Sequence, residues 1–258
     1  YGTNPCSEII LRPNQFCNLT EVMVRAEDTL DTLKEKVRLA TILGTYQSTL
    51  TDFKYLRKRW KDNTEDERLL GVSLTGIMDS PLTNGRAYDD VEAGLEHTLT
   101  ELKKVAVETN KEWADAFGVP ASVAITCVKP SGTVSQLTDT ASGIHARHSD
   151  YYIRRVRGDM KDSLTKFLRE KAGVSFEYAI SGYQDIDETK PIYNENLGVF
   201  SFPVQAPINS VTRDDENAID QLKLWLSYYR HWCEHKPSIT VSVRDDEWLN
   251  VAAWVYDH

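Results

Sequence analysis

The sequence predicts an α/β fold, in which long amphipathic helices alternate with short β-strands. Residues 29–61 and 88–117 carry apolar side chains at steps of three and four positions, with charged residues between them. This is the period of a helix that buries one face. Residues 121–128 are nearly all apolar or small, which is typical of a strand covered on both faces. Long helices between such strands favour an α/β sheet or barrel.

Shorter patterns complete the expected order of elements. Gly118 and Pro120 predict the end of the second long helix. Two shorter helices are expected, one over residues 159–172 with its end at Gly173, and one over residues 214–235. Strands are predicted for the β-rich runs at residues 122–128, 151–156, 175–180, 199–204 and 239–243.

Composition limits the classes of function. Of the 258 residues, 41% are hydrophobic and 27% are charged, which is ordinary for a soluble globular protein. The 39 acidic and 30 basic residues give a net charge of -9, which argues against direct nucleic-acid binding. No apolar run approaches membrane-spanning length and no signal-peptide pattern opens the chain. Four cysteines are too few for a secreted disulfide scaffold, so we expect a cytoplasmic protein.

Residues 1–258 are predicted to form one structural unit, because no internal repeat, low-complexity tract or Gly/Ser linker interrupts them. The richest motif begins three residues after Tyr1. A catalytic loop at the very start of a chain would have no structure before it to hold it. We therefore expect this chain to be part of a longer protein.

Two cysteines near the start, Cys6 and Cys17, are the first candidates for chemistry. Asn4-Pro5 favours an extended or turn backbone, which exposes Cys6. Glu8 lies two residues further along and is expected on the same side as Cys6, where it would be a proton acceptor. Buried structural thiols are the alternative interpretation of both cysteines.

The segment from Lys129 to Ser135 is the second candidate, because it directly follows the strand predicted to be buried. Pro130 and Gly132 favour a tight turn, which leaves backbone N–H groups and the Ser131 and Thr133 hydroxyls available to phosphate oxygens. A plain surface turn is the alternative. The chain has no P-loop signature and no G-x-G-x-x-G motif.

Residues 142–149 and 151–157 concentrate basic side chains in an acidic protein. They could hold phosphates or an anionic cofactor, but a solvated strand face is the commoner arrangement of such a run. His231, Cys233 and His235 are spaced two apart, so on a helix they point away from one another and are not expected to bind a metal.

Taken together, these motifs resemble the catalytic half of a ribonucleotide reductase. The likeness is greatest to the adenosylcobalamin-dependent (class II) enzymes of the monomeric ribonucleoside-triphosphate type. The matching runs are in the family's order at residues 4–8, 16–22, 71–77, 129–133, and 142–148 with 151–157.

The resemblance implies part of a ten-stranded α/β barrel, as in glycyl-radical enzymes, with the radical cysteine on a finger loop through its centre. Residues 1–258 would be a single fragment of that catalytic barrel, truncated at both ends. The family's second reducing cysteine lies upstream of Asn4, and its C-terminal dithiol has no counterpart after Cys233. The isolated fragment is therefore expected to be inactive.

The resemblance also implies roles for individual residues. Cys6 would carry the thiyl radical that abstracts the ribose 3′-hydrogen. Glu8 would take the 3′-hydroxyl proton, and Asn4 would hydrogen-bond a ribose hydroxyl. Cys17 would be half of the dithiol that is oxidised as the 2′-hydroxyl leaves as water. The substrate phosphates would be held by the loop residues Pro130, Ser131, Gly132, Thr133 and Val134.

The implied cofactor is adenosylcobalamin, whose cobalt–carbon bond homolysis is the family's source of the radical. The implied substrate is a ribonucleoside triphosphate, reduced to the deoxyribonucleotide for DNA synthesis. Thioredoxin or a similar dithiol would be the reductant, and a deoxynucleotide would be the effector of the full-length protein. No resident metal ion is expected.

Two alternatives stay open at this point. In the first, the chain belongs to the large subunit of a two-component reductase that receives its radical from a separate metal-bearing subunit. In the second, it is a non-catalytic nucleotide-binding module in which Cys6 and Cys17 are a regulatory thiol pair. Glu8 and Asn4 beside Cys6 argue against the module, because binding phosphates requires neither.

Overall fold

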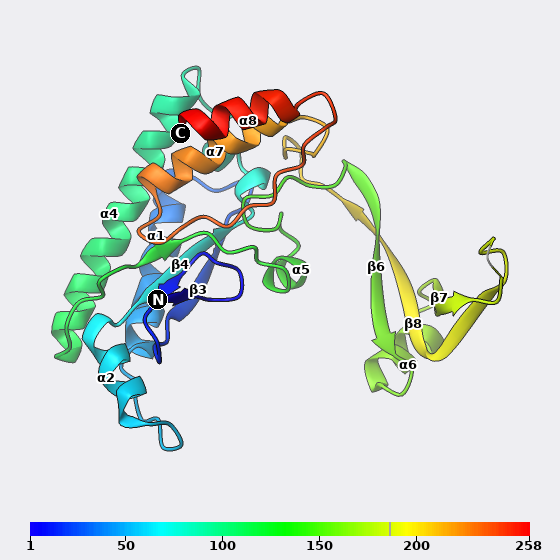
Figure 1. The fold of residues 1–258 in the computed structure, drawn as a ribbon, viewed down its shortest axis with the longest axis horizontal. Helices are drawn as coiled ribbons and strands as arrows, with labels where there is room; N and C mark the ends of the chain where they lie inside the picture. The colour runs from blue at the N-terminus through cyan, green and yellow to red at the C-terminus, as the bar shows by residue number, and fades with distance from the viewer. Residues whose placement is uncertain (186) are drawn as a thin grey trace. The chain divides into compact units, whose positions relative to one another are not determined.

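The computed structural model describes residues 1–185 and 187–258. These form two compact units, the first made of residues 1–148 and 207–258 and the second of residues 149–206 (Figure 1). The single structural unit expected from the absence of a linker is thus divided in two. That the chain is one truncated catalytic-barrel fragment stays a prediction.

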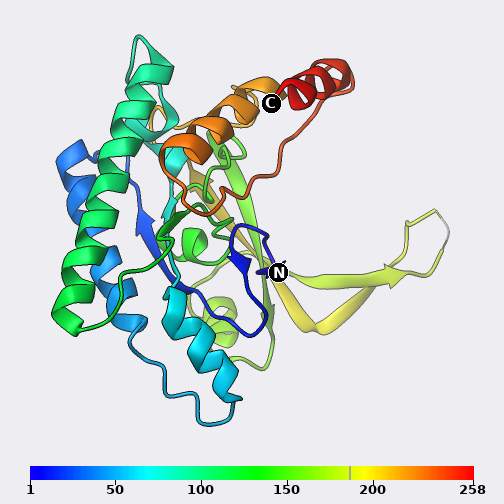
Figure 2. The ribbon, with the colours of Figure 1, turned by 60° about the vertical axis from the view of Figure 1, so that its left-hand side comes forward.

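The first unit is built on a parallel sheet with the order β3-β4-β5, made of β3 (Asn18–Met23), β4 (Leu70–Thr75) and β5 (Thr126–Cys127). Parallel neighbours need long crossover connections. The crossovers contain α1 (Leu30–Gln47) and α4 (Val91–Phe117), which lie side by side in both views (Figure 1 and Figure 2). The α/β fold predicted from the sequence is therefore confirmed.

The core of this unit lies between the sheet and the two helices. Its buried side chains come from the strands and from both helices, and the later residues Leu224, Tyr228 and Trp232 join them. Because β4 is buried along its whole length, it is the central strand on which the other elements pack. The principal core residues are Leu33, Val37, Leu70, Val72, Leu74, Leu99 and Leu102.

The single helix expected over residues 29–61 is wrong. The chain instead forms α1, which ends at Gln47, and α2 (Lys58–Glu67). The Ser48 carbonyl accepts a hydrogen bond of 2.7 Å from the buried Arg68 guanidinium. That bond satisfies one of the carbonyls that a helix end leaves without a partner, so a contact between distant residues stabilises the break.

The prediction for α4 is confirmed, including its end. The Asp90 side chain accepts a hydrogen bond from the Ala93 N–H and caps the first turn. Gly118 has a φ of 68° and its N–H donates to carbonyls of the last turn, which is the usual glycine termination of a helix.

The strand expected at residues 239–243 is wrong. The N–H of Thr240 donates to the His145 ring and that of Ser242 to the Gln221 side chain, so both bond to side chains instead of a neighbouring strand. The helix predicted over residues 214–235 is confirmed with a shorter extent, and a terminal helix was not predicted. The remaining elements of the first unit are β1 (Gly2–Thr3), β2 (Ile10–Leu11), the 3₁₀ helix η1 (Ile77–Asp79), α3 (Pro81–Asn84), α5 (Val134–Thr138), α7 (Ala218–His231) and α8 (Trp248–Asp257).

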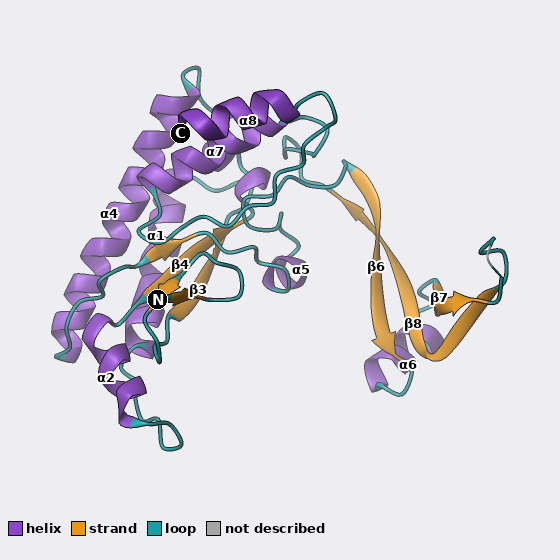
Figure 3. Ribbon diagram, viewed as in Figure 1, coloured by secondary structure: helices purple, strands orange, loops and turns teal. Residues whose placement is uncertain are grey.

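The second unit is an antiparallel sheet with the order β6-β8-β7 (Figure 3). The three strands expected in this region are present, and the helix begins later than predicted because the preceding strand extends to Asp159. The elements are β6 (Tyr151–Asp159), α6 (Ser163–Glu170), β7 (Phe176–Tyr183) and β8 (Pro191–Gln205). Among the helices of the described residues, none is long and apolar enough to cross a membrane.

Candidate active site

Cys6 lies on the turn of a small hairpin. Strands β1 and β2 pair with Gly2 opposite Leu11, and the turn closes through a 3.0 Å hydrogen bond from the Ser7 N–H to the Asn4 carbonyl. Ser7 has a φ of 62°, a left-handed conformation that lets the chain reverse within a few residues. The Cys6 thiol is exposed, as predicted from Asn4-Pro5.

Glu8 lies under this turn and is completely buried. Its Oε1 accepts a hydrogen bond of 2.5 Å from Asn4 Nδ2 and lies 2.5 Å from Lys129 Nζ. Its Oε2 has no hydrogen-bond partner within residues 1–185 and 187–258. The turn thus exposes Cys6 and buries the carboxylate two residues further on. A buried carboxylate needs a partner of opposite charge, and Lys129 is that partner.

Sequence reasoning gave Lys129 no role. The residue follows β5, and its backbone N–H donates to Ser73 Oγ of β4 at 2.9 Å. Burial lowers the pKa of Lys129, but the hydrogen bond and the charge of Glu8 outweigh it, with smaller contributions from Cys127 and Cys6, so that the pKa is raised overall. The position just after a buried strand was the available signal, but a partner 121 positions away was not predictable.

Cys17 precedes β3 and is partly buried. Burial raises its pKa to about 12, an effect that Lys129 partly offsets and Glu8 reinforces. A Cβ placed on Gly71 would lie 3.5 Å from the Cys17 sulfur and 3.3 Å from the Cys127 sulfur. The two thiols therefore flank the bare backbone of Gly71. Cys127 is fully buried, as expected of a core residue.

Glu21 is a second carboxylate that sequence reasoning missed. It pairs across the sheet with Ser73, which pairs in turn with Cys127, so the three residues form one row. Burial raises the pKa of Glu21, and the neighbouring Ser131 hydroxyl and Lys129 ammonium partly offset the rise. Ser73, in the middle of this row, accepts a hydrogen bond from the Lys129 N–H, and the Lys129 ammonium pairs with Glu8. Lys129 therefore connects the row to the carboxylate of Glu8.

The loop at residues 130–134 is a tight turn, as its composition predicted. Ser131 adopts a φ of 52°, and Ser142 Oγ donates to the Pro130 carbonyl at 2.6 Å. Gly132, Thr133 and Val134 are exposed, whereas Ser131 is buried. The loop therefore presents backbone and a hydroxyl outward and is anchored from beneath.

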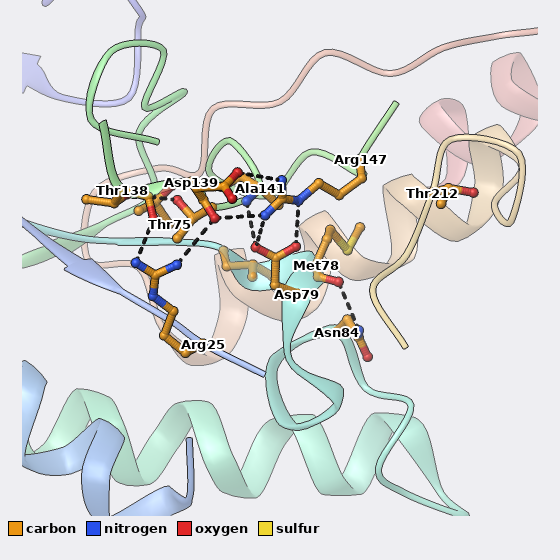
Figure 4. Close-up of polar contacts among 12 residues, drawn as sticks. Arg25, Thr75, Met78, Asp79, Asn84, Thr138, Asp139, Ala141, Arg147 and Thr212 are labelled. Atoms are coloured by element: carbon orange, nitrogen blue, oxygen red, sulfur yellow. Dashed lines mark hydrogen bonds and ion pairs between the residues drawn. The ribbon is translucent and has the colours of Figure 1, made fainter. Parts of the chain in front are cut away.

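The segment that follows this loop is held by an ion pair between Arg147 and Asp79 of η1 (Figure 4). Both side chains are 2% exposed. The guanidinium donates from Nε to Asp79 Oδ1 at 2.8 Å and from Nη2 to Oδ2 at 2.9 Å, and the Ala141 N–H donates to Oδ2 at 2.7 Å. For Arg147 the solvated strand face is therefore wrong, because distant Asp79 draws it into the interior.

The other members of the basic runs differ from Arg147. His145 bonds through Nδ1 to the Ser142 carbonyl at 2.8 Å, and its Nε2 accepts from Thr240. Arg155 and Arg157 on β6 are exposed, so the solvated strand face is confirmed there.

Comparison with known proteins shows what this chain is similar to. Residues 1–122 match the family model of the ribonucleotide reductase barrel domain. The chain is 27% identical to an adenosylcobalamin-dependent ribonucleoside-triphosphate reductase of Lactobacillus gasseri, over 100% of this chain and 36% of that protein. The relative from Lactobacillus acidophilus is 29% identical over 95% and 34%. A probable enzyme of the same name from Dictyostelium discoideum is 28% identical over 93% and 29%.

Among solved structures, a B12-dependent (class II) ribonucleotide reductase shares the fold with a TM-score of 0.78 at 24% identity, covering 99% of this chain and 37% of that one. Residues 1–122 thus match the barrel domain of the ribonucleotide reductases, and the chain as a whole shares the fold of a class II enzyme. Its curated relatives are the adenosylcobalamin-dependent ribonucleoside-triphosphate reductases, which confirms the resemblance carried by the motifs. The chain spans about a third of their length.

Proposed function

We propose that the protein containing this chain reduces ribonucleoside triphosphates to 2′-deoxyribonucleoside triphosphates by a cysteine thiyl radical. The observation that carries the proposal is the hairpin itself. It exposes the Cys6 thiol and buries the Glu8 carboxylate two residues further on, with Asn4 and Lys129 on one carboxylate oxygen and the other oxygen unpartnered within the described chain. A nucleotide-binding module would have no need of this arrangement.

Adenosylcobalamin is the proposed cofactor, and Cys6 is the residue that fits it. An exposed thiol at the tip of a turn can be approached by a bulky group that a buried thiol could not reach. When bound, the cofactor supplies the radical by homolysis of its cobalt–carbon bond. The chain's own contribution at this point is the Cys6 S–H, which loses its hydrogen atom and then takes the 3′-hydrogen of the ribose.

Glu8 is the proposed base for the 3′-hydroxyl. Its unpartnered Oε2 is buried, so a substrate hydroxyl donating to it would satisfy an acceptor that otherwise lacks a hydrogen bond. Asn4 donates to Oε1 of the same carboxylate, and in this proposal the second N–H of its amide would donate to a ribose hydroxyl. Loss of the 3′-proton to Glu8 assists departure of the 2′-hydroxyl as water.

Cys17 is one of the two proposed reducing thiols. With a pKa of about 12 it remains an S–H group at neutral pH, which suits a donor of hydrogen to the substrate. Two thiols become one disulfide while the ribose 2′-carbon is reduced and one water is released, so electrons and atoms balance. Thioredoxin or a similar dithiol would reduce the disulfide, and a deoxynucleotide would act as effector. The loop of Pro130, Ser131, Gly132, Thr133 and Val134 would hold the phosphates, with the backbone N–H groups of the exposed residues Gly132, Thr133 and Val134 as donors.

The test uses the parent full-length protein with CTP and a dithiol, with and without adenosylcobalamin, and measures dCTP. We expect product only with the cofactor, and formation without it would favour a two-component reductase. Cys6→Ser should abolish turnover, since a hydroxyl does not replace the S–H bond as a hydrogen donor. Cys17→Ser should allow at most about one turnover, because no disulfide can be cycled. Multiple turnovers by Cys6→Ser would refute the assignment.

A further inference from the structure

Lys129 is the charged centre of the hairpin site. Its ammonium lies 2.5 Å from Glu8 Oε1, the same oxygen to which Asn4 donates. The lysine side chain is 23% exposed, whereas that of Glu8 is 0% exposed. The cation thus reaches from the rim of the site to a carboxylate that has no access to solvent.

The backbone of Lys129 is fixed at both its N–H and its carbonyl group. Its N–H donates to Ser73 Oγ on β4. On the other side, Gly143 approaches the Lys129 carbonyl so closely that a Cβ at Gly143 would clash with it. The ammonium therefore extends from a fixed point at the end of β5, and this fixes the direction from which it meets Glu8.

The two carboxylate oxygens of Glu8 have different surroundings. Both donors, Asn4 and Lys129, occupy Oε1, and this leaves Oε2 as the acceptor for a substrate hydroxyl. A buried carboxylate without a counter-charge takes up a proton and can no longer act as a base. One nearby cation therefore keeps the group charged and orients it.

We propose that Lys129 is a positioning residue that holds Glu8 ionised, with Oε2 free to accept the substrate hydroxyl. This deepens the proposed function and rests on the role of Glu8 in it. The competing role follows from the sequence position: Lys129 directly precedes Pro130 of the loop proposed for the phosphates. A phosphate contact by Lys129 would affect substrate binding, whereas positioning of Glu8 affects the chemical step.

The kinetic test uses the parent protein with adenosylcobalamin, CTP and a dithiol. For Lys129→Met we expect kcat to fall roughly ten- to a hundredfold, part of what a positioned base contributes, while KM for CTP changes less than about twofold. Lys129→Arg should recover most of the loss, because it restores the cation. In a Glu8→Gln background, Lys129→Met should cause no further loss, because the two residues act as one unit. Unchanged kcat in Lys129→Met, additive losses, or a raised KM with kcat retained would each overturn the proposal.

A second measurement does not depend on activity. Difference infrared spectroscopy of Lys129→Met against the unmodified protein at neutral pH should show a new protonated-carboxyl band. The band should be missing from Lys129→Arg and from the Lys129→Met, Glu8→Gln double variant. Its absence from Lys129→Met would overturn the positioning role even in an active enzyme. If the parent protein makes no deoxynucleotide at all, the proposed function fails, and the band still decides whether Lys129 keeps Glu8 ionised.

Discussion

The buried ion pair of Arg147 and Asp79 leads to a quantitative prediction about the stability of residues 138–148. Replacing Asp79 by alanine removes three hydrogen bonds at once, two from the guanidinium and one from the Ala141 N–H. It also leaves the Arg147 guanidinium buried without this carboxylate. Arg147 keeps a 3.0 Å bond to the Asp139 carbonyl and a 3.2 Å contact with its carboxylate, which is 65% exposed.

The expected cost follows from these contacts. Breaking a buried ion pair by removing one partner costs about 3–5 kcal/mol. The contacts to Asp139 place Asp79→Ala toward the lower half of this range, at about 3–4 kcal/mol. Each 1.4 kcal/mol is about tenfold in an equilibrium constant, so local opening of the segment should become more than about a hundredfold more frequent.

Hydrogen exchange of the parent protein, followed by mass spectrometry of peptides covering residues 138–148, measures this opening. The matched control is Arg155→Met, which breaks the exposed ion pair with Glu177 on the second unit's sheet and should change local stability by less than about 1 kcal/mol. Replacing both partners, Asp79→Leu with Arg147→Met, should recover most of the loss, because no buried charge is left. Unaltered exchange of residues 138–148 in Asp79→Ala would refute the anchoring role.

Two further predictions concern the thiols and the glycine between them. In the native parent protein at mildly alkaline pH, iodoacetamide should label exposed Cys6 well before Cys17 or Cys127, because burial raises the pKa of both of the latter. Labelling of Cys17 should keep rising with pH toward its pKa of about 12, as measured by peptide mass spectrometry; equal labelling of Cys6 and Cys17 at neutral pH would contradict the burial. Gly71→Ala should destabilise the protein by about 1–3 kcal/mol, because its Cβ would clash with Leu19 and lie only 3.3 Å from the buried Cys127 sulfur. An unchanged melting temperature would count against this packing.

The features of the site that depend on local sequence were predictable. The exposure of Cys6 follows from Asn4-Pro5, and the tight turn after β5 follows from Pro130 and Gly132. The long helix α4 was predictable because its period, its cap and Gly118 all agree.

The features that depend on distant partners were not predictable. Arg147 lies in a run that looks like a solvated face, and its burial is set by Asp79, 68 positions earlier. Strand β3 was missed because it has no clear alternation of apolar and polar residues. Strand β4 was missed although its apolar residues Leu70, Val72 and Leu74 alternate with small or polar ones. Parallel pairing, which brings Leu19 opposite Gly71, depends on segments far apart in the chain. The role of Lys129 was hidden for the same reason.

The way in which the second unit is inserted into the chain indicates where the length of this protein can change. Residues 149–206 leave and rejoin the first unit at neighbouring points: Tyr151 pairs with Gln205, and just outside the insertion Arg147 pairs with Thr212. An inserted module whose ends already meet adds little loop-closure entropy when its length changes. The strands of the second unit could therefore be shortened, extended or replaced by a short turn. The β1–β2 hairpin that carries Cys6 and the ion pair of Arg147 with Asp79 would keep their own contacts. The insertion is a place where such a chain can acquire or lose a surface without rebuilding its chemistry.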